Sequence, residues 1–358
     1  MAERLENAAG ERLCFLCLQG LGNLLLAEPA IAAAKAEVGA ATVTVVVRQR
    51  GYAALLSNHP AVDEVVCLAP TTLLALRRRR FQRVYTCFPA NDWRFELITW
   101  LVGGDERVGH RYLLRKRLHL PGAYTREVWV EGVDDVQQNL NLVGAHLVAR
   151  PPHLAVEPVA APRPLLALHP GSSTAHRMAL KRWPPGHFRN LIERALAATP
   201  DLTVWLFAGP GEVELAEAIG GGLGPRVEVV AGLPLVEVAR RLAACTCMVA
   251  NDSGLMHLAA AVGVPTIGLF GPTDPLRTAP RPGLALQAVG VACAPCWPLH
   301  GVGRRPLCPH AERLCMVQLT PERVWAAVAP RLATSRSAPA PVLQTTRGSS
   351  PPPPTERR

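Results

Sequence analysis

A short polar run late in the chain brings an amide, a carboxylate and a hydroxyl together. The run is NDSG at 251–254, and the apolar stretch before it, at 245–250, is typical of a buried strand. A helix should follow, with Asp252 or Ser253 as its cap and His257 on its first turn. A cap explains one polar residue but not the whole run. We interpret these groups as ligands for ribose hydroxyls and phosphate oxygens.

A second stretch, HPGSSTAHRMALKRWP at 169–184, places small and hydroxyl residues directly after a predicted strand. Ser172 and Ser173 offer hydroxyl donors where a phosphate would sit. Lys181 follows just before a predicted helix, and a lysine there neutralises a diphosphate as a point charge. Trp183 is expected to be a packing residue. The alternative is an ordinary loop between strand and helix with solvent-exposed cations.

The third stretch, GLGN at 20–23, lies between a predicted strand and a predicted helix. Backbone N–H groups and the positive end of that helix would face an anion there. A dinucleotide fingerprint is incomplete, because Leu25 occupies its third glycine position and Arg48-Gln49-Arg50 replaces the acid expected for the ribose. The alternative is a tight turn that needs glycine for its geometry alone.

Elements that position these loops alternate along the chain, which is typical of parallel sheets wrapped by helices. Strands are expected at 13–18, 42–47, 83–88, 164–170, 202–209, 226–232, 245–250 and 265–271, the last ending in the polar loop GPTDP. Helices are expected after Gly22 and at 92–102, 184–198, 234–244 and 254–263, with an amphipathic stretch at 136–148. The region 104–134 is charged, and we expect it to be irregular.

A proline-rich stretch interrupts the alternation midway, and the alternation then restarts. We therefore predict an α/β protein of two Rossmann-like, doubly wound domains that face each other across a cleft. Ligands of such sheets bind beyond the carboxyl ends of the strands. The predicted divisions are a first domain at 1–150, a linker at 151–164, a second domain at 165–332 and a disordered Pro/Ser/Thr-rich tail at 333–358.

The composition favours a folded chain with acidic partners. The 358 residues are enough for two domains, and 49% are hydrophobic, which excludes a wholly disordered protein. The net charge is +10, with Arg77-Arg78-Arg79-Arg80 and a cluster at 111–117. These arginines are either a basic surface that meets anionic lipid or polysaccharide, or ordinary solvated side chains. We expect no nucleic-acid partner.

The N-terminal sequence MAERLENAAGER lacks the basic-then-apolar order of a signal peptide. No stretch has the roughly 20 uninterrupted apolar residues of a membrane span. We therefore expect a cytoplasmic protein, peripheral at the inner membrane face. Ten cysteines in such a chain indicate reduced thiols, and four of them, Cys14, Cys17, Cys245 and Cys247, are expected in the core.

The late cysteines are a candidate metal set. Cys293 and Cys296 form a CxxC pair, but Cys308 and Cys315 have six residues between them and give no second CxxC. A structural zinc site on these four thiolates is the alternative. We predict no metal and no cofactor.

The chain as a whole resembles the heptosyltransferase-type members of glycosyltransferase family nine, which add heptose from ADP-heptose to the lipopolysaccharide core of Gram-negative bacteria. The likeness covers roughly residues 12–330. The segments that carry it are GLGN followed by Pro29, FELITWLVGGDERVGHRY (95–112), VDDVQQNLNLV (133–143), HPGSS to LKRWP (169–184), WLFAGPGEVELAEAI (205–219), NDSGLMHLAAAVGVPTIGLFGPTDP (251–275) and the cysteine-containing segment at 293–324.

This resemblance implies a GT-B fold and sugar transfer with inversion at the anomeric carbon without a metal ion. The sequence contains no Asp-x-Asp motif. It also implies a nucleotide-sugar donor in the C-terminal domain and a glycolipid acceptor in the N-terminal domain. Matched by motif, the donor residues are Ser172, Ser173 and Lys181 at the diphosphate, Asp252, Ser253, Gly254 and His257 around ribose and phosphates, and Glu228 at the nucleoside.

The catalytic base departs from the family pattern. An inverting transfer needs a base for the acceptor hydroxyl proton, and the family places an aspartate after the second loop glycine. That position is Asn23 here, and an amide cannot accept the proton. Another carboxylate would then act, with Asp92 as the first candidate and Glu28 or Glu96 behind it. Alternatively, the acceptor phosphate or water takes the proton while Asn23 positions the hydroxyl, or the chain binds without efficient turnover.

We therefore expect an inverting, metal-independent glycosyltransferase that moves a sugar, heptose from ADP-heptose, to a lipopolysaccharide-core or related glycolipid. Its catalytic residues would be Asn23, Asp92 and Lys181. The rival function is a non-catalytic protein of the same fold that binds a sugar nucleotide or glycan. A nucleotide-sugar epimerase is a further rival, because it can share the paired-domain architecture.

Overall fold

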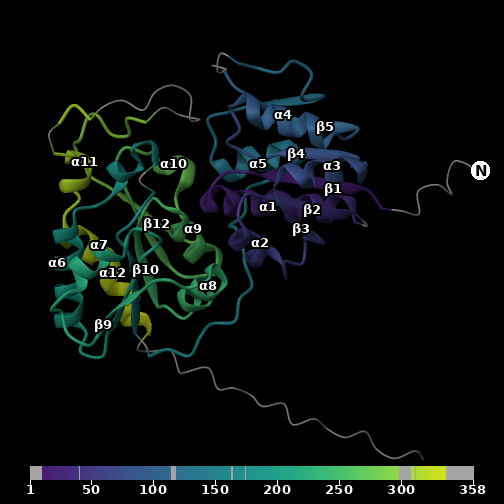
Figure 1. Cartoon of the computed structure of the whole chain (residues 1–358). Coiled ribbons are helices and arrows are strands. Elements are labelled where there is room, and N and C mark those ends of the chain that lie inside the picture. Colours follow the sequence, from purple (N-terminus) through teal and green to yellow (C-terminus); the bar gives the residue numbers. More distant parts are fainter. Residues whose placement is uncertain are drawn as a thin grey trace, which may run out of the picture.

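Two parallel sheets with flanking helices make up the protein, as a computed structural model shows (Figure 1). The structure describes residues 10–39, 41–113, 118–162, 164–173, 175–297, 308–310 and 312–335. Most of the predicted tail and part of the basic cluster at 111–117 lie outside this range. We call residues 10–150 the N-terminal half and residues 164–335 the C-terminal half. The last helix, α12 (Pro321–Ser335), reaches into the first residues of the predicted tail.

The first sheet forms from short runs of β-branched and aliphatic residues, and all of its strand pairs are parallel. Its strands are β1 (Arg12–Cys17), β2 (Thr42–Val47), β3 (Glu64–Cys67), β4 (Arg83–Thr86), β5 (Glu106–Arg111) and β6 (Arg126–Trp129). Its helices are α1 (Leu21–Val38), α2 (Arg50–Leu56), α3 (Pro70–Arg78), α4 (Trp93–Val102) and α5 (Asp135–Val143). The expectation of an irregular region at 104–134 was wrong, because β5 and β6 lie there.

The second sheet is also parallel throughout. Its strands are β7 (Leu165–His169), β8 (Thr203–Phe207), β9 (Val227–Val230), β10 (Cys247–Asn251), β11 (Thr266–Phe270) and β12 (Gly283–Gln287). Its helices are the 3₁₀ helix η1 (Ala175–Lys181), α6 (Pro185–Ala198), α7 (Val213–Gly220), α8 (Leu235–Ala243), α9 (Gly254–Ala261), α10 (Pro275–Thr278), α11 (Leu314–Val317) and α12.

Both sheets have the same strand order, and this order determines between which two strands the order reverses in each sheet. The first runs β3-β2-β1-β4-β5-β6, and the second runs β12-β11-β10-β7-β8-β9. Each is the Rossmann order, in which the strand order reverses between the first and the fourth strand. The reversals therefore lie between β1 and β4 and between β7 and β10. A crevice for ligands opens beyond the carboxyl ends of the strands at such points.

The halves meet through helices, with α1 against α9 and α2 against α8 (Figure 1). Glycine allows the close approach of α1 and α9, since a Cβ atom on Gly22 would lie 2.7 Å from His257 Cδ2. A Cβ atom on Gly254 would lie 3.0 Å from Leu21 Cβ. Buried residues of both halves form one continuous apolar cluster, which includes Leu24 of the first half.

The proline-rich segment runs from one half to the other without regular secondary structure. Its backbone is tied to the C-terminal half, because Leu154 N–H donates to Ala261 O at 2.8 Å and Val159 N–H donates to Arg240 O at 3.2 Å. Its start is tied to the N-terminal half by a bond from His153 N–H to Glu28 Oε2 at 2.8 Å. Glu28 is buried and also pairs with His59, so it anchors this segment.

Candidate active site

A cleft of about 510 Å³ lies between the halves, where the loops of both sheet reversals meet. The N-terminal half lines it with the loop after β1, with α2, with the segment after β4 and with the start of α5. The C-terminal half contributes the loops after β7, β10 and β11. The lining residues are Gly20, Leu21, Gly22, Asn23, Tyr52, Pro89, Asp135, Ser173, Met178, Lys181, Asp252, Ser253, Gly254, His257, Thr273, Asp274, Arg277, Thr278 and Trp297.

A buried ion pair lies on the C-terminal side of the cleft. Lys181 Nζ is 3.0 Å from Asp252 Oδ2, and both side chains are 9% exposed. Burial acts to raise the pKa of Asp252, but the Lys181 ammonium and His257 hold it below its ordinary value. Burial lowers the pKa of His257 to about 4 against the opposing effect of Asp252, so this imidazole is neutral at pH 7. Lys181 is therefore a buried cation on this side of the cleft.

Ser253 occupies the N-cap position of α9 but does not cap it. Its hydroxyl contacts His169 Nδ1 at 2.9 Å, and His169 Nε2 contacts Glu212 Oε2 at 3.0 Å. The expected cap by Asp252 or Ser253 was wrong, because α9 has no side-chain cap and Asp252 pairs with Lys181. The first N–H groups of α9 thus receive no capping side chain, which suits an anion in the cleft.

Asn251 has a structural role in this site. It is fully buried, and its Oδ1 accepts from Trp183 N–H at 2.9 Å. Its Nδ2 donates to Pro170 O at 2.8 Å, which ties the loop after β7 to the end of β10. Trp183 is 1% exposed, so the prediction of a packing residue is confirmed.

The two serines of the first donor loop differ. Ser173 lines the cleft and is exposed. Ser172 is 2% exposed, and its hydroxyl donates to Met178 O at 3.0 Å while Arg182 Nε donates to that hydroxyl at 3.3 Å. Ser172 does not line the cleft, and it shapes the loop that presents Ser173.

The remaining predicted acids lie away from the cleft lining. Asp92 is the N-cap of α4, where its carboxylate accepts from Arg94 N–H at 3.1 Å. Glu96 accepts from Leu120 N–H at 2.6 Å and contacts His119. Glu228 lies on the edge strand β9 and accepts from Trp205 Nε1 at 2.9 Å. A role for any of these three in the reaction stays a prediction.

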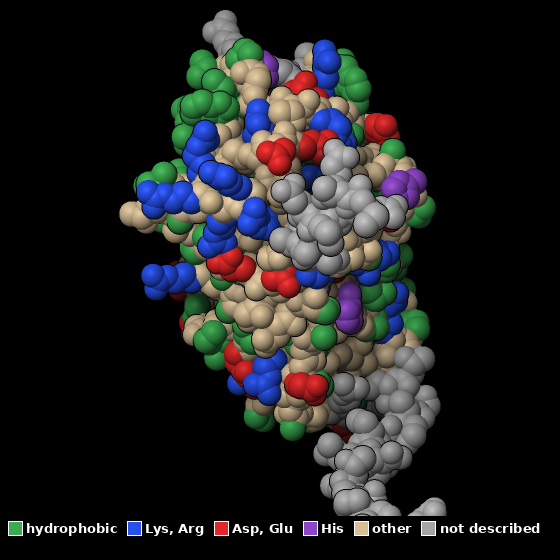
Figure 2. Space-filling model, turned by 90° about the vertical axis from the view of Figure 1, so that its right-hand side faces the viewer, with side chains coloured by type: hydrophobic (Ala, Val, Ile, Leu, Met, Phe, Trp, Pro, Cys, Tyr) green, Lys and Arg blue, Asp and Glu red, His purple; other side chains and the backbone are tan. Residues whose placement is uncertain are grey.

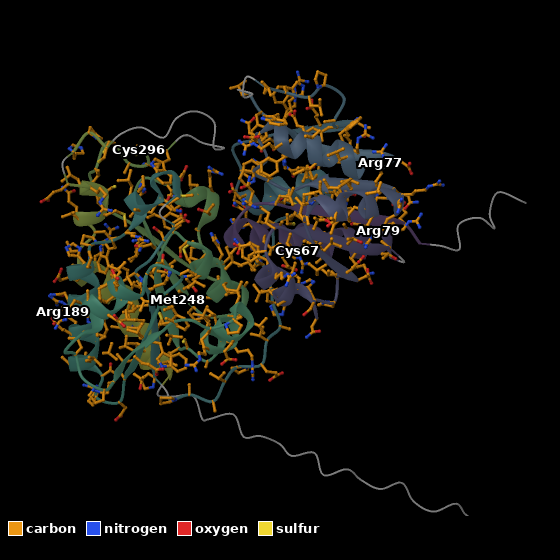
Figure 3. All side chains as sticks on the ribbon, viewed as in Figure 1. Cys67, Arg77, Arg79, Arg189, Met248 and Cys296 are labelled. Atoms are coloured by element: carbon orange, nitrogen blue, oxygen red, sulfur yellow. The ribbon has the colours of Figure 1, made fainter. Side chains whose placement is uncertain are left out.

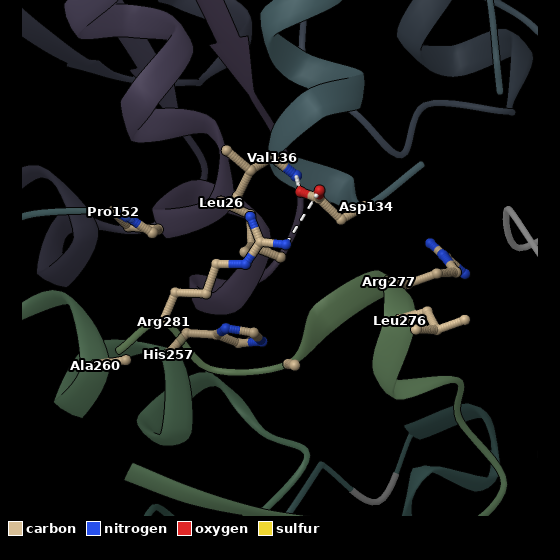
Figure 4. A pocket seen from close by; sticks show the side chains of 10 residues that line it. Leu26, Asp134, Val136, Pro152, His257, Ala260, Leu276, Arg277 and Arg281 are labelled. Carbon is tan, nitrogen blue, oxygen red and sulfur yellow. Dashed lines mark hydrogen bonds and ion pairs between the residues drawn. The ribbon is translucent and has the colours of Figure 1, made fainter. Parts of the chain in front are cut away.

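An ion pair that no sequence motif predicted crosses the cleft. Asp135, at the start of α5, accepts three hydrogen bonds of 2.9–3.0 Å from the guanidinium of Arg277 on α10. Burial raises the pKa of Asp135 to about 6, although Arg277 opposes the shift. A second pair, Arg281 Nη2 to Asp134 Oδ2 at 3.3 Å, lies in a small pocket beside it (Figure 4). The signal was the Asp134-Asp135 dipeptide, which the motif VDDVQQNLNLV contained.

The late cysteines line a separate small cavity with Pro272 and Trp297. Burial and the neighbouring thiols together raise the pKa of Cys315 to about 11. Within the described ranges, no group of three or more His, Cys, Asp or Glu side chains could hold a metal ion. The expected core cysteines Cys14, Cys17, Cys245 and Cys247 are all buried, as predicted.

The sequence matches the profile of one protein family. Residues 108–297, more than half of the chain, match the profile of glycosyltransferase family 9 (heptosyltransferase). The chain belongs to glycosyltransferase family 9. No helix in the part of this family 9 chain that the structure describes is long and apolar enough to cross a membrane.

Relatives of this family 9 protein align over parts of their length. Lipooligosaccharide heptosyltransferase 2 of Haemophilus influenzae is 37% identical over 123 residues, 33% of this chain and 34% of the relative. The enzyme of the same name from Campylobacter jejuni serotype O:2 is 31% identical over 167 residues, 45% and 48%. Lipopolysaccharide heptosyltransferase 1 of Escherichia coli K12 is 41% identical over 96 residues, 26% and 29%. The aligned segments therefore span less than half of these relatives.

Solved structures are similar over nearly the whole chain. E. coli ADP-heptose LPS heptosyltransferase II matches with a TM-score of 0.72 and 21% identity, covering 91% of this chain and 99% of that one. E. coli heptosyltransferase WaaC with ADP matches with a TM-score of 0.68 and 22% identity, covering 89% and 99%. At this identity the likeness shows the fold, and the predicted GT-B arrangement is confirmed.

Proposed function

We propose that this family 9 protein is an inverting, metal-independent glycosyltransferase that moves heptose from ADP-heptose to a lipopolysaccharide-core glycolipid. The observation that carries the proposal is the cleft, which joins the cationic Lys181 wall to the GLGN loop at the reversals of both sheets. The names and ligands of the relatives support the choice of donor and acceptor. In this proposal, residues 1–150 form the acceptor domain and residues 165–332 the donor domain.

The donor diphosphate would lie against the C-terminal wall. Lys181 has the charge to stabilise a leaving diphosphate, and its ammonium lies 5.9 Å from the centre of the Trp297 ring. The amino end of α9, at Gly254, and the hydroxyl of Ser173 supply further donors for phosphate oxygens. No metal is needed in this scheme, because a lysine and a helix end neutralise the developing charge.

The acceptor would lie against the N-terminal wall. Asn23 lines the cleft from the first turn of α1, where its amide can accept and donate a hydrogen bond. Such a group orients a sugar hydroxyl toward the anomeric carbon but does not remove its proton. A different group must therefore act as the base.

Contact with an anionic membrane is part of the proposal. On α3 and α4, which pack together, Leu74, Trp93 and Trp100 are 56%, 37% and 49% exposed. Arg77 and Arg79 project from this end of the N-terminal half (Figure 3), and Figure 2 shows arginine and lysine side chains gathered on the face it presents. Aromatic side chains among arginines suit the interface of an anionic membrane, where a glycolipid acceptor resides.

The test is release of ADP. The protein is incubated with ADP-heptose and a heptose-deficient core glycolipid, and ADP and the lengthened glycolipid are quantified. We expect both products in equal amounts and only in the presence of the acceptor. If calorimetry shows binding of ADP-heptose but no ADP is released, the result would favour the rival function, a non-catalytic binding protein. Asn23 at the base position would then explain the lack of turnover.

A further inference from the structure

The cleft contains three carboxylates among its described lining residues, and two of them belong to the C-terminal half, which would hold the donor. Asp252 is paired with Lys181 on the donor wall. Asp274 caps α10, where its Oδ1 accepts from Leu276 N–H at 2.9 Å. Asp135 is the carboxylate that the N-terminal half contributes to this lining. The acids considered from sequence, Asp92, Glu28 and Glu96, do not contribute to it.

We propose that Asp135 accepts the proton of the acceptor hydroxyl and so replaces the carboxylate that is absent at Asn23. This inference rests on the proposed glycosyltransferase function. It assigns the base to the start of α5 instead of the start of α1.

The fold holds the two positions in one wall. Helices α1 and α5 pack against each other, and both Asn23 and Asp135 lie on the first turns of these helices and line the cleft. Asn139 fixes α5 in place, since its Oδ1 accepts from Phe88 N–H at 2.9 Å and its Nδ2 donates to Leu26 O at 3.4 Å. Moving the carboxylate from α1 to α5 therefore keeps it on the acceptor side.

Burial and charged neighbours together set the basicity of Asp135, and burial has the largest effect. Arg277 from α10 donates to both of its oxygens and favours the ionised form, while Asp252 from the donor wall and Asp134 on the same helix disfavour it. Tyr112, at the end of β5, also faces it. The resulting pKa of about 6 leaves the carboxylate ionised at pH 7 and close to the value that suits a general base.

The step balances without another reagent. The acceptor oxygen attacks the anomeric carbon and forms the new C–O bond, while the bond from that carbon to the phosphate oxygen breaks. The nucleoside diphosphate leaves with the electron pair beside Lys181. The hydroxyl proton passes to Asp135, whose Oδ2 keeps one lone pair beside its bond to Arg277, and Asp135 later returns the proton to water.

The competing role for Asp135 is structural: its ion pair with Arg277 would act only as a strap, that is, a contact that holds the two halves together. Asp134 provides the matched control. Both are aspartates at the start of α5, and both pair with an arginine of the C-terminal half. Asp134 lines the small side pocket of Figure 4 and not the cleft. Since Asn also serves as an N-cap, Asp134→Asn keeps the helix and weakens the strap.

The experiment compares Asp135→Asn, Asp135→Glu and Asp134→Asn with the wild type in the ADP-release assay. We expect Asp135→Asn to lower kcat by ~10²-fold or more, which is the typical effect of losing a general base. The KM for ADP-heptose should stay within about threefold of the wild-type value. Asp135→Glu should recover part of the rate. Asp134→Asn should stay within about fivefold of the wild type, because Asp134 does not face the reacting groups.

The pH profile of kcat distinguishes a general base from an ion pair that only holds the halves together. Below pH about 6 the wild-type kcat should fall tenfold per pH step as Asp135 becomes protonated, and Asp135→Asn should lose this acidic limb. Calorimetric titration with ADP should show that Asp135→Asn still folds and binds. Equal losses in Asp135→Asn and Asp134→Asn, or an acidic limb retained in Asp135→Asn, would overturn the assignment.

Failure of the underlying function has a different signature. A wild-type protein that binds ADP-heptose but releases no ADP overturns the glycosyltransferase proposal and, with it, the role of Asp135. A wild-type protein that turns over while Asp135→Asn turns over equally well overturns the role of Asp135 alone.

Discussion

Lys181 and Asp252 form a buried ion pair, and replacing the lysine should affect the reaction more than a surface charge would. Lys181→Met leaves Asp252 buried without its cation and removes the charge that faces the leaving diphosphate. We expect kcat to fall by ~10²-fold or more, as for other residues that stabilise a developing charge. Steady-state ADP release measures the fall in kcat, and calorimetry with ADP measures how much the lost charge weakens binding of the diphosphate.

Lys35 provides the control for this prediction. It pairs with Asp63 at 2.7 Å, is partly exposed and does not line the cleft. Lys35→Met should therefore leave kcat within about twofold, because exposed ion pairs contribute little. A Lys181→Met protein as active as Lys35→Met would contradict the role of Lys181.

Asn23 offers a second residue-scale test. In the wild-type background, Asn23→Asp should raise kcat by less than about tenfold, because the proposed base is already present. In the Asp135→Asn background, the same change should restore a large part of the lost rate, since a carboxylate returns to the acceptor wall. No recovery in the double variant would show that position 23 cannot serve as the base here.

Single residues show where sequence reasoning succeeds. Lys181, Asp252 and His257 could be found because each lies in a segment that follows a predicted strand, and parallel strands bring the starts of such segments to one edge. Asp135 could not be found in this way. Its partner Arg277 is 142 positions away in the sequence, so neither the burial nor the raised pKa follows from a local pattern.

At the scale of elements, charge concealed two strands. In β6, the sequence REVW is only half-buried at the edge of the sheet, and β5 contains arginine and glutamate. Charged residues on edge strands prevent unwanted pairing with other chains, but they also remove the apolar run by which a strand is recognised. The central strands, such as β1, are buried along nearly all their length and were placed to within a residue or two.

The contact of α1 with α9 gives a prediction at this scale. Gly22→Ala would place a Cβ atom 2.7 Å from the His257 ring, so the His257 side chain or one of the two helices must shift. We expect the free energy of unfolding to fall by ~1–3 kcal/mol, the usual cost of overpacking. Urea denaturation followed by circular dichroism measures it.

Gly20 is the matched control for Gly22. A Cβ atom there meets no atom within 4 Å, and φ is −75°, which alanine adopts freely. Gly20→Ala should therefore cost less than about 1 kcal/mol, as expected for alanine in place of glycine at an N-cap. Equal destabilisation by the two variants would mean that the close approach of the helices is not what Gly22 provides.

At the scale of the whole molecule, the exposed surface of α3 and α4 should bind anionic vesicles. We expect cosedimentation with phosphatidylcholine vesicles only when they contain phosphatidylglycerol, and a loss of binding as salt is raised. The double variant Leu74→Ser with Trp100→Ser should weaken binding by about tenfold or more, because apolar area and nearby arginines act together.

Val289 is the control for this surface, since it is 75% exposed in the C-terminal half. Val289→Ser should bind vesicles like the wild type. Binding that ignores lipid charge, or that survives in the double variant, would count against the membrane contact.

The apolar cluster that runs through both halves ties their folding together. Leu24 on α1 and Leu258 on α9 belong to the same buried cluster, although their helices flank different sheets. Separation of the halves would expose this shared surface to water, at a cost that grows with its area. An exchange of either Rossmann unit for the corresponding unit of another protein would therefore have to preserve this shared apolar surface.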